Sequence, residues 1–268
     1  MCFKYDFRVG ILHDFYKYAV IAGIALFACT DFYLKMGASE ETVVLSDYIF
    51  HLFRGMKPYI QGEGEFEVPI LWFTINLYLA YLIGKYPKED LCRSGVNVLL
   101  KAKSRLKWYL SKAVWCIMTV VIYYGIIYFV ILGFCVYTGT DLALQVHFSG
   151  NSAFLLYSDR EDISYWTLFL LPILCSAAIS LMQMTVTFLT DVVYGFLTVA
   201  VLLIASAYLY TPVLIGNLSM LERCEYFQSD GINLTVSYLL CIAWAIISVL
   251  AGGKYFEKYD ILGDNTAP

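Results

Sequence analysis

The chain has 268 residues, of which 60% are hydrophobic and 15% are charged. Soluble domains usually hold about 25% charged and about 45–50% apolar residues, so this composition excludes a soluble enzyme with a large hydrated surface and a disordered chain. The net charge of −4 gives no reason to expect a nucleic-acid partner, and the mean hydropathy of +0.68 predicts a single integral membrane domain over residues 1–268.

The first fifteen residues have a pattern of their own. Phe3, Phe7, Ile11 and Phe15 recur every four residues, and charged residues lie between them. This spacing predicts a helix over residues 1–15 that lies flat in the headgroup region with its apolar side down. A disordered leader is the alternative interpretation.

Six apolar blocks are candidates for membrane crossings, each of which needs about 20 apolar residues. We therefore expect an all-α integral membrane fold with six transmembrane helices, at about 16–34, 68–84, 113–137, 165–189, 192–215 and 236–253. Asp191 is the only charge between the fourth and fifth blocks. These two blocks form either one long buried hairpin or two crossings joined by a tight turn.

The segment between the first two spans is the longest predicted outer segment, residues 35–67. Its stretch 46–60 (SDYIFHLFRGMKPYI) is rich in aromatic residues and lightly charged. It is typical of a re-entrant or interfacial helix that packs against the bundle.

Basic residues are distributed unevenly between the two predicted sides of the membrane. If the N-terminus is inside, 13 of the 18 lysines and arginines fall in inner segments. Because cytoplasmic loops carry the excess of such residues, both termini are predicted to be cytoplasmic in a multi-pass protein.

The predicted cytoplasmic loop 85–112 is the most informative segment. It carries eight basic residues against only Glu89 and Asp90, and it encloses an apolar island at Val96–Leu100. One interpretation is a short surface helix that offers an apolar and basic face to another protein. The other is a positive-inside anchor that contacts anionic lipid.

Residues 95–112 (GVNVLLKAKSRLKWYLSK) resemble the cytoplasmic loop of type 2 ABC exporter permeases from Gram-positive bacteria. In that family the loop lies between the second and third spans and carries the coupling helix. The resembling features are Ser104-Arg105, Trp108 and Ser111-Lys112. Segments 216–223 and 253–262, the six-span layout and the flat N-terminal helix are similar too.

The resemblance implies a transport function in a bacterial plasma membrane. A separate cytoplasmic ATPase subunit would bind ATP and Mg²⁺, and two permease chains, identical or paralogous, would form one pore for outward movement of an amphiphilic peptide, lipid or drug. This chain would then hold no cofactor and would not be an enzyme. The residues implied to enter the ATPase groove are Val96, Asn97, Leu99 and Leu100, and those implied to pair with its acidic rim or with lipid headgroups are Lys101, Lys103 and Arg105.

The fourth predicted span carries a polar stripe. Ser176, Ser180, Gln183 and Thr187 are spaced so that they share one helix face, and Asn76 is a similar single residue in the second span. The stripe either lines a substrate path or subunit seam, or it packs against neighbouring helices.

Other function classes find less support in the sequence. No G-x-x-x-x-G-K-[ST] phosphate loop and no histidine within a predicted span is present, and the eight cysteines show no metal or disulfide spacing. We therefore expect no catalytic site and no metal site. An ion-coupled carrier usually needs a deep ionisable group, whereas Asp31 and Asp191 lie at span ends. A membrane scaffold or sensor that docks a partner on the basic loop remains the main alternative.

Overall fold

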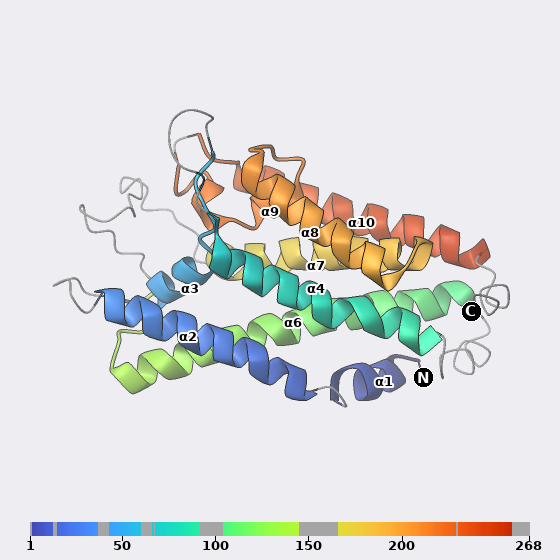
Figure 1. Ribbon diagram of the computed structural model, residues 1–268, viewed down its shortest axis with the longest axis horizontal. Coiled ribbons are helices and arrows are strands. Elements are labelled where there is room, and N and C mark those ends of the chain that lie inside the picture. Colours follow the sequence, from blue (N-terminus) through green and yellow to red (C-terminus); the bar gives the residue numbers. More distant parts are fainter. Residues whose placement is uncertain are drawn as a thin grey trace.

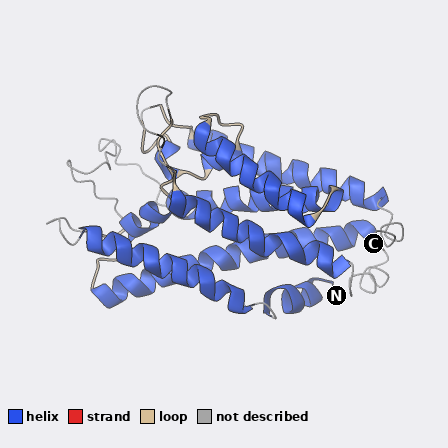
Figure 2. Ribbon diagram, in the orientation of Figure 1, coloured by secondary structure: helices blue, strands red, loops and turns tan. Residues whose placement is uncertain are grey.

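The computed structural model describes residues 2–12, 15–36, 43–59, 66, 68–91, 104–144, 166–228 and 230–258. These residues form a bundle whose long helices run roughly along one common axis (Figure 1). Within the described ranges the secondary structure is helical and contains no β-strand (Figure 2). The fold is therefore all-α, as the sequence predicts.

Each of the six apolar blocks forms a helix. Four helical segments are long and apolar enough to cross a membrane: Phe15–Met36, Arg105–Thr138, Trp166–Leu189 and Leu234–Lys258. They contain or correspond to α2 (Tyr18–Met36), α6 (Arg105–Thr138), α7 (Trp166–Leu189) and α10 (Leu234–Lys258). The other two blocks form α4 (Ile70–Asp90), which ends in a charged turn, and α8 (Val192–Tyr208), which is apolar but short.

Helix α7 lies at the centre of the bundle. It packs against α10, α8, α6 and α4, and 15 of its 24 residues are buried. The outer helices expose apolar side chains instead, such as Leu197 and Val201 on α8 and Ile246 and Leu250 on α10. An apolar core surrounded by an apolar exterior is the arrangement that a hydrocarbon solvent favours.

Several helices continue past the bounds that hydropathy predicts. The third begins at Arg105 rather than near 113, the second runs to Asp90 rather than 84, and the sixth reaches Lys258 rather than 253. The predicted loop 85–112 is therefore helical at both ends, because backbone hydrogen bonding in a helix does not stop where apolar residues stop. At about 1.5 Å per residue, α6 is about 51 Å long, which exceeds the hydrocarbon thickness of about 30 Å.

The fifth predicted span is wrong over its last seven residues. Helix α8 ends at Tyr208 rather than 215, and the chain then folds into the short helices α9 (Ile215–Leu218) and η4 (Leu221–Arg223). Pro212 lies in this break, and a proline cannot supply the backbone N–H that a continuing helix needs. Residues 215–224 are nevertheless fully buried.

A tight turn joins α7 and α8. Only Thr190 and Asp191 separate the two helices, and the Asp191 carboxylate accepts a hydrogen bond of 2.7 Å from the backbone N–H of Val192. Lys88 at the end of α4 lies 3.0 Å from the same carboxylate and holds the pKa of Asp191 below its usual value. The structure thus has two helices joined by a tight turn, which is compatible with both arrangements that the sequence leaves open, a buried hairpin and two crossings.

Short helices pack against the bundle near both of its ends. The predicted helix 1–15 is divided into α1 (Cys2–Phe7) and η1 (Arg8–Leu12), which pack against α6 beside the end of α4 (Figure 1). Helix α3 (Leu45–Phe53) lies near the opposite end, and seven of its nine residues are buried against the bundle. The first part of the aromatic segment 46–60 is thus a helix packed against the bundle, whereas residues 54–59 are not helical.

Candidate functional site

The apolar island of the predicted coupling loop lies outside the described residues, as do all but one of the residues implied to contact the ATPase. The single exception is Arg105, the first residue of α6. Its guanidinium donates a hydrogen bond of 3.0 Å to the backbone oxygen of Glu257 at the end of α10. Ser104 precedes it and accepts a hydrogen bond from the Lys107 N–H at 3.4 Å, as a helix N-cap does.

Aromatic packing fixes the position of the chain where it leaves this loop. The ring of Trp108 stacks on that of Phe256, with centroids 5.0 Å apart and planes 16° apart. The Tyr109 hydroxyl forms a hydrogen bond of 3.0 Å with the Thr185 hydroxyl. The start of α6 is therefore held against α10 and α7, and a force on the loop would reach both helices.

A buried ionic cluster lies eight residues into α6. The Lys112 ammonium contacts a carboxylate oxygen of Asp6 and lies 2.6 Å from one of Asp90, and none of the three side chains is more than 3% exposed. The hydroxyls of Tyr86 and Tyr5 donate hydrogen bonds of 3.0 Å to Asp6 and Asp90, respectively. This Asp6–Lys112–Asp90 cluster joins α1, α4 and α6.

The sequence pattern does not predict this cluster. The predicted stripe in residues 1–15 places Asp6 on the polar side of its helix, but Asp6 is 1% exposed. Phe15, on the predicted apolar side, is 56% exposed. The sequence offers one physical signal for the cluster. An aspartate and a lysine that are buried in a packed bundle each require a partner of opposite charge.

The residues of the polar stripe are all buried, and Ser176, Gln183 and Thr187 lie where α7 contacts α6, α4 and α8. The Ser176 hydroxyl lies 2.6 Å from the Tyr124 hydroxyl and 3.4 Å from the Asn76 side-chain oxygen, and the Gln183 amide donates to the Ala80 oxygen at 2.8 Å. Ser180 and Thr187 are 2% and 0% exposed. The structure thus brings the stripe and Asn76 together in a helix seam. A role in a substrate path stays a prediction.

Two glycines allow α4 and α8 to approach α7 closely at this seam. A Cβ on Gly195 of α8 would lie 2.1 Å from the Thr187 hydroxyl, and one on Gly84 of α4 would lie 3.0 Å from the Gln183 amide nitrogen. Close backbone approach through small residues is typical of helix packing in membranes.

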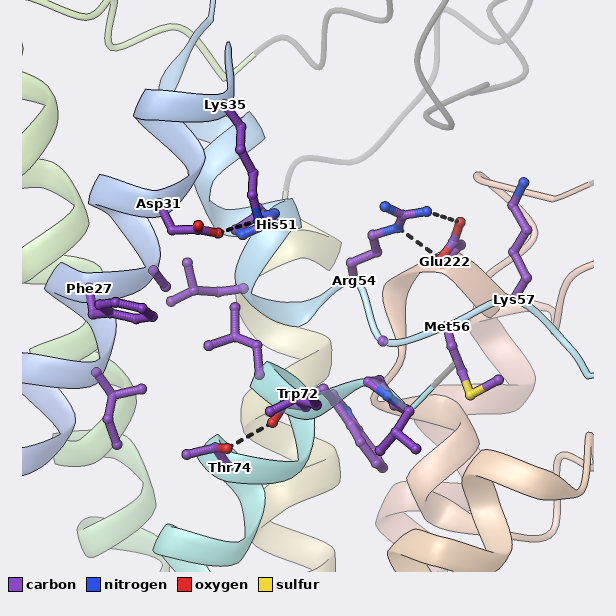
Figure 3. A pocket seen from close by; sticks show the side chains of 18 of the residues that line it. Phe27, Asp31, Lys35, His51, Arg54, Met56, Lys57, Trp72, Thr74 and Glu222 are labelled. Carbon is purple, nitrogen blue, oxygen red and sulfur yellow. Dashed lines mark hydrogen bonds and ion pairs between the residues drawn. The ribbon is translucent and has the colours of Figure 1, made fainter. Parts of the chain in front are cut away.

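A cleft of about 1260 Å³ opens at the other end of the bundle, between α2, α3, the segment 54–59 and the start of α4. We call it the outer cleft. Figure 3 shows charged side chains along one side of it and apolar side chains along the other. Its apolar lining includes Val20, Ile24, Phe27, Leu52, Ile70 and Leu71, and its charged lining consists of Asp31, Lys35, Arg54, Lys57 and Glu222.

Ion pairs hold most of the charged lining in place. Lys35 lies 2.6 Å from Asp31, one helical turn away. Arg54 meets Glu222 with two hydrogen bonds, of 2.9 and 3.0 Å, in a bidentate arrangement (Figure 3). The second pair ties the segment after α3 to η4, which lies 168 residues further along the chain.

Arg223 joins the segment 54–59 to the end of α8. Its guanidinium, which is almost fully buried, donates to the backbone oxygens of Ala207 and Met56, both at 2.9 Å. The carbonyls of the last turn of a helix attract a positive charge, so Arg223 caps the end of α8 while it holds segment 54–59. Burial lowers the pKa of Arg223 to about 10, which still leaves it charged at neutral pH.

Among the titratable groups that line the cleft, His51 has the most strongly shifted pKa. Its ring stacks on Phe32 with centroids 4.7 Å apart. Burial, followed by the nearby Lys35 ammonium, lowers the pKa of His51 to about 4, and Asp31 only partly opposes this. His51 is therefore neutral at pH 7, and the charge of the cleft lining comes from the lysines, the arginine and the carboxylates.

Among the residues that the structure describes, no group of three histidine, cysteine or acidic side chains is placed to hold a metal ion. The cleft lining offers paired charges and an apolar wall. Comparison with known proteins adds nothing to this assignment: neither a protein-family model nor a curated protein matches the sequence.

Proposed function

We propose that this chain is the membrane-spanning permease subunit of an ATP-driven exporter for amphiphilic molecules. The observation that carries the proposal is the outer cleft, which combines an apolar helix wall with a charged rim at one end of a bundle of apolar helices. The basic loop at the other end, which resembles a coupling loop, supplies the second argument.

The proposal includes an arrangement in the membrane. α4 and α8 cross together with the four longer apolar helices, which gives six crossings with both termini in the cytoplasm of a bacterial cell. The excess of lysine and arginine in the inner segments supports this orientation. The outer cleft then faces outward, and the end of α4 and the start of α6 face the cytoplasm.

The mechanism requires two partners. A separate ATPase subunit binds and hydrolyses ATP with Mg²⁺, and a second permease chain completes the pore. Motion of the loop would reach α10 through the Arg105–Glu257 contact and the stacking of Trp108 on Phe256. Movement of α6 against α10 and α7 is the route by which work done on the loop would alter the bundle.

The test is purification of the tagged chain from its native membrane under mild conditions. We expect a stoichiometric ATPase to accompany it, and we expect the double substitution Leu99→Asp/Leu100→Asp to remove both the partner and the ATP hydrolysis. Leu142→Asp/Leu144→Asp is the matched control, because these exposed leucines lie in a predicted outer segment, and it should retain the partner.

Two results would contradict the proposal. Purification with a cytoplasmic protein that hydrolyses no nucleotide would favour the scaffold or sensor. Transport driven by a proton or sodium gradient without ATP would favour an ion-coupled carrier, for which the buried Asp6–Lys112–Asp90 cluster is the specific observation.

A further inference from the structure

The charged rim of the outer cleft has an excess of positive charge. Three cationic residues and two acidic residues line it. Asp31 pairs with Lys35, and Glu222 pairs with Arg54, whereas Lys57 is exposed and no described residue pairs with its ammonium. A bound molecule with one negative charge would complete this set.

The apolar wall of the cleft continues from this rim along α2. It extends from Asp31 back to Val20, which is eleven residues or about 16 Å of helix. One leaflet of the hydrocarbon core is about 15 Å thick. The wall therefore has the length of one acyl chain that starts at the headgroup level.

Gly23 leaves this wall open. It lines the cleft, and a Cβ at this position would find no atom within 4 Å. The neighbouring Phe27 is 71% exposed, and Val20 is 50% exposed. The described residues thus leave this surface uncovered, and the cleft volume of about 1260 Å³ exceeds that of an ordinary drug-sized pocket, about 300–1,000 Å³.

We propose that the outer cleft binds a single-chain amphiphile with an anionic headgroup, with the acyl chain against α2 at Gly23 and the headgroup at Lys57. This inference rests on the proposed function in one respect, because it takes the bound amphiphile as the class of substrate that the exporter moves. Binding itself requires neither ATP nor a partner chain.

The experiment measures binding to the purified full chain in neutral detergent by native mass spectrometry. The probes are lysophosphatidylglycerol and lysophosphatidylcholine of equal chain length, which differ in headgroup charge, and a cationic alkylammonium of the same length. We expect the anionic probe to bind several times more tightly than the other two.

Two variants test the two halves of the cleft. Lys57→Gln should weaken the anionic probe by about fivefold, which corresponds to about 1 kcal/mol, and should leave the zwitterionic probe unchanged. Gly23→Phe should fill the apolar wall and abolish binding of both. The controls are Lys254→Gln, which removes an exposed lysine of α10, and Gly125→Phe, whose Cβ also meets open space but lies on α6 away from the cleft.

Several outcomes would overturn the inference. Equal binding of the anionic and zwitterionic probes would show that charge plays no part. A preference for the cationic probe would point to Glu63, Glu65 and Glu67 of the adjoining sequence instead of Lys57. Binding unaffected by Gly23→Phe would place the probe elsewhere. If the ATPase still accompanies the chain in any of these cases, only the ligand assignment fails, and the proposed function stands.

Discussion

Individual charged residues in this protein are buried where hydropathy would not place them. Lys112 adjoins an apolar block and Asp6 lies in an apparently exposed helix pattern, yet they meet in the interior of the bundle. Taking such charges out of water is costly, and the cost is offset only when partners and hydrogen bonds are complete. The hydroxyls of Tyr5, Tyr86 and Ser111 complete this set.

We predict that Lys112→Met destabilises the fold by about 3–5 kcal/mol, because it leaves two buried carboxylates without their shared cation. The measurement is unfolding in mixed micelles with increasing denaturing detergent. Lys254→Met, which removes an exposed lysine, should change the free energy of unfolding by less than about 0.5 kcal/mol. Equal effects of the two substitutions would contradict the role assigned to the cluster.

His51 should make stability depend on pH. Its pKa of about 4 in the folded state lies below the ordinary value of 6.5, so the unfolded chain binds a proton more readily. Its contribution to stability is complete above pH 6.5 and is lost as the pH falls from there toward 4, with a slope of at most about 1.4 kcal/mol per pH unit.

The measurement is the unfolding free energy of the wild type and of His51→Gln between pH 7 and pH 5. The wild type should lose stability over this interval more steeply than the variant, because glutamine does not titrate. Parallel curves would show that other groups govern the response to acid.

At the scale of helices, the sequence predicts which segments are helical but not where each one ends. Hydropathy identifies the six apolar blocks, since the membrane imposes that signal. It places the start of α6 near residue 113, although Ser104 caps the helix and Arg105 begins it. The fifth block is overextended because residues 209–215 are largely apolar, although helix α8 ends at Tyr208 and Pro212 lies in the break that follows. Beyond the break, Arg223 is buried by protein and donates to backbone oxygens, since an isolated charge in lipid would be far less favourable.

The polar stripe of α7 illustrates the same limit. Its residues share one helix face, as the spacing of Ser176, Ser180, Gln183 and Thr187 predicts, but spacing does not say what that face meets. The close contacts of Gly84 and Gly195 decide this, and they depend on the three-dimensional arrangement of α4, α7 and α8.

We predict that Gly195→Ala destabilises the fold by about 1–3 kcal/mol, because the new methyl group would overlap the Thr187 hydroxyl. Thr187→Ala should restore most of the loss when the two substitutions are combined, since it removes the overlapping atom. Gly125→Ala is the control: it meets open space, and it should stabilise α6 by up to about 1 kcal/mol. Additive effects of the pair would contradict the seam contact.

On the scale of the whole molecule, the two ends of the bundle have different physical characters. One end carries the outer cleft with its paired charges and apolar wall. The other carries the Asp6–Lys112–Asp90 cluster and the stacked rings of Trp108 and Phe256, which join α6 to α10. Membrane character and an all-α fold are predicted from composition together with the length of the apolar blocks. The cleft does not, because its lining comes from residues between 20 and 222 that no local pattern relates.

We propose that a nucleotide-hydrolysing partner binds the apolar island of the basic loop and drives the bundle through it. The most direct measurement is photo-crosslinking in intact native membranes from a photoreactive amino acid at position 99, followed by identification of the adduct. The account predicts a covalent adduct with an ATPase chain. An adduct with phospholipid alone, with no ATPase among the products, would contradict it.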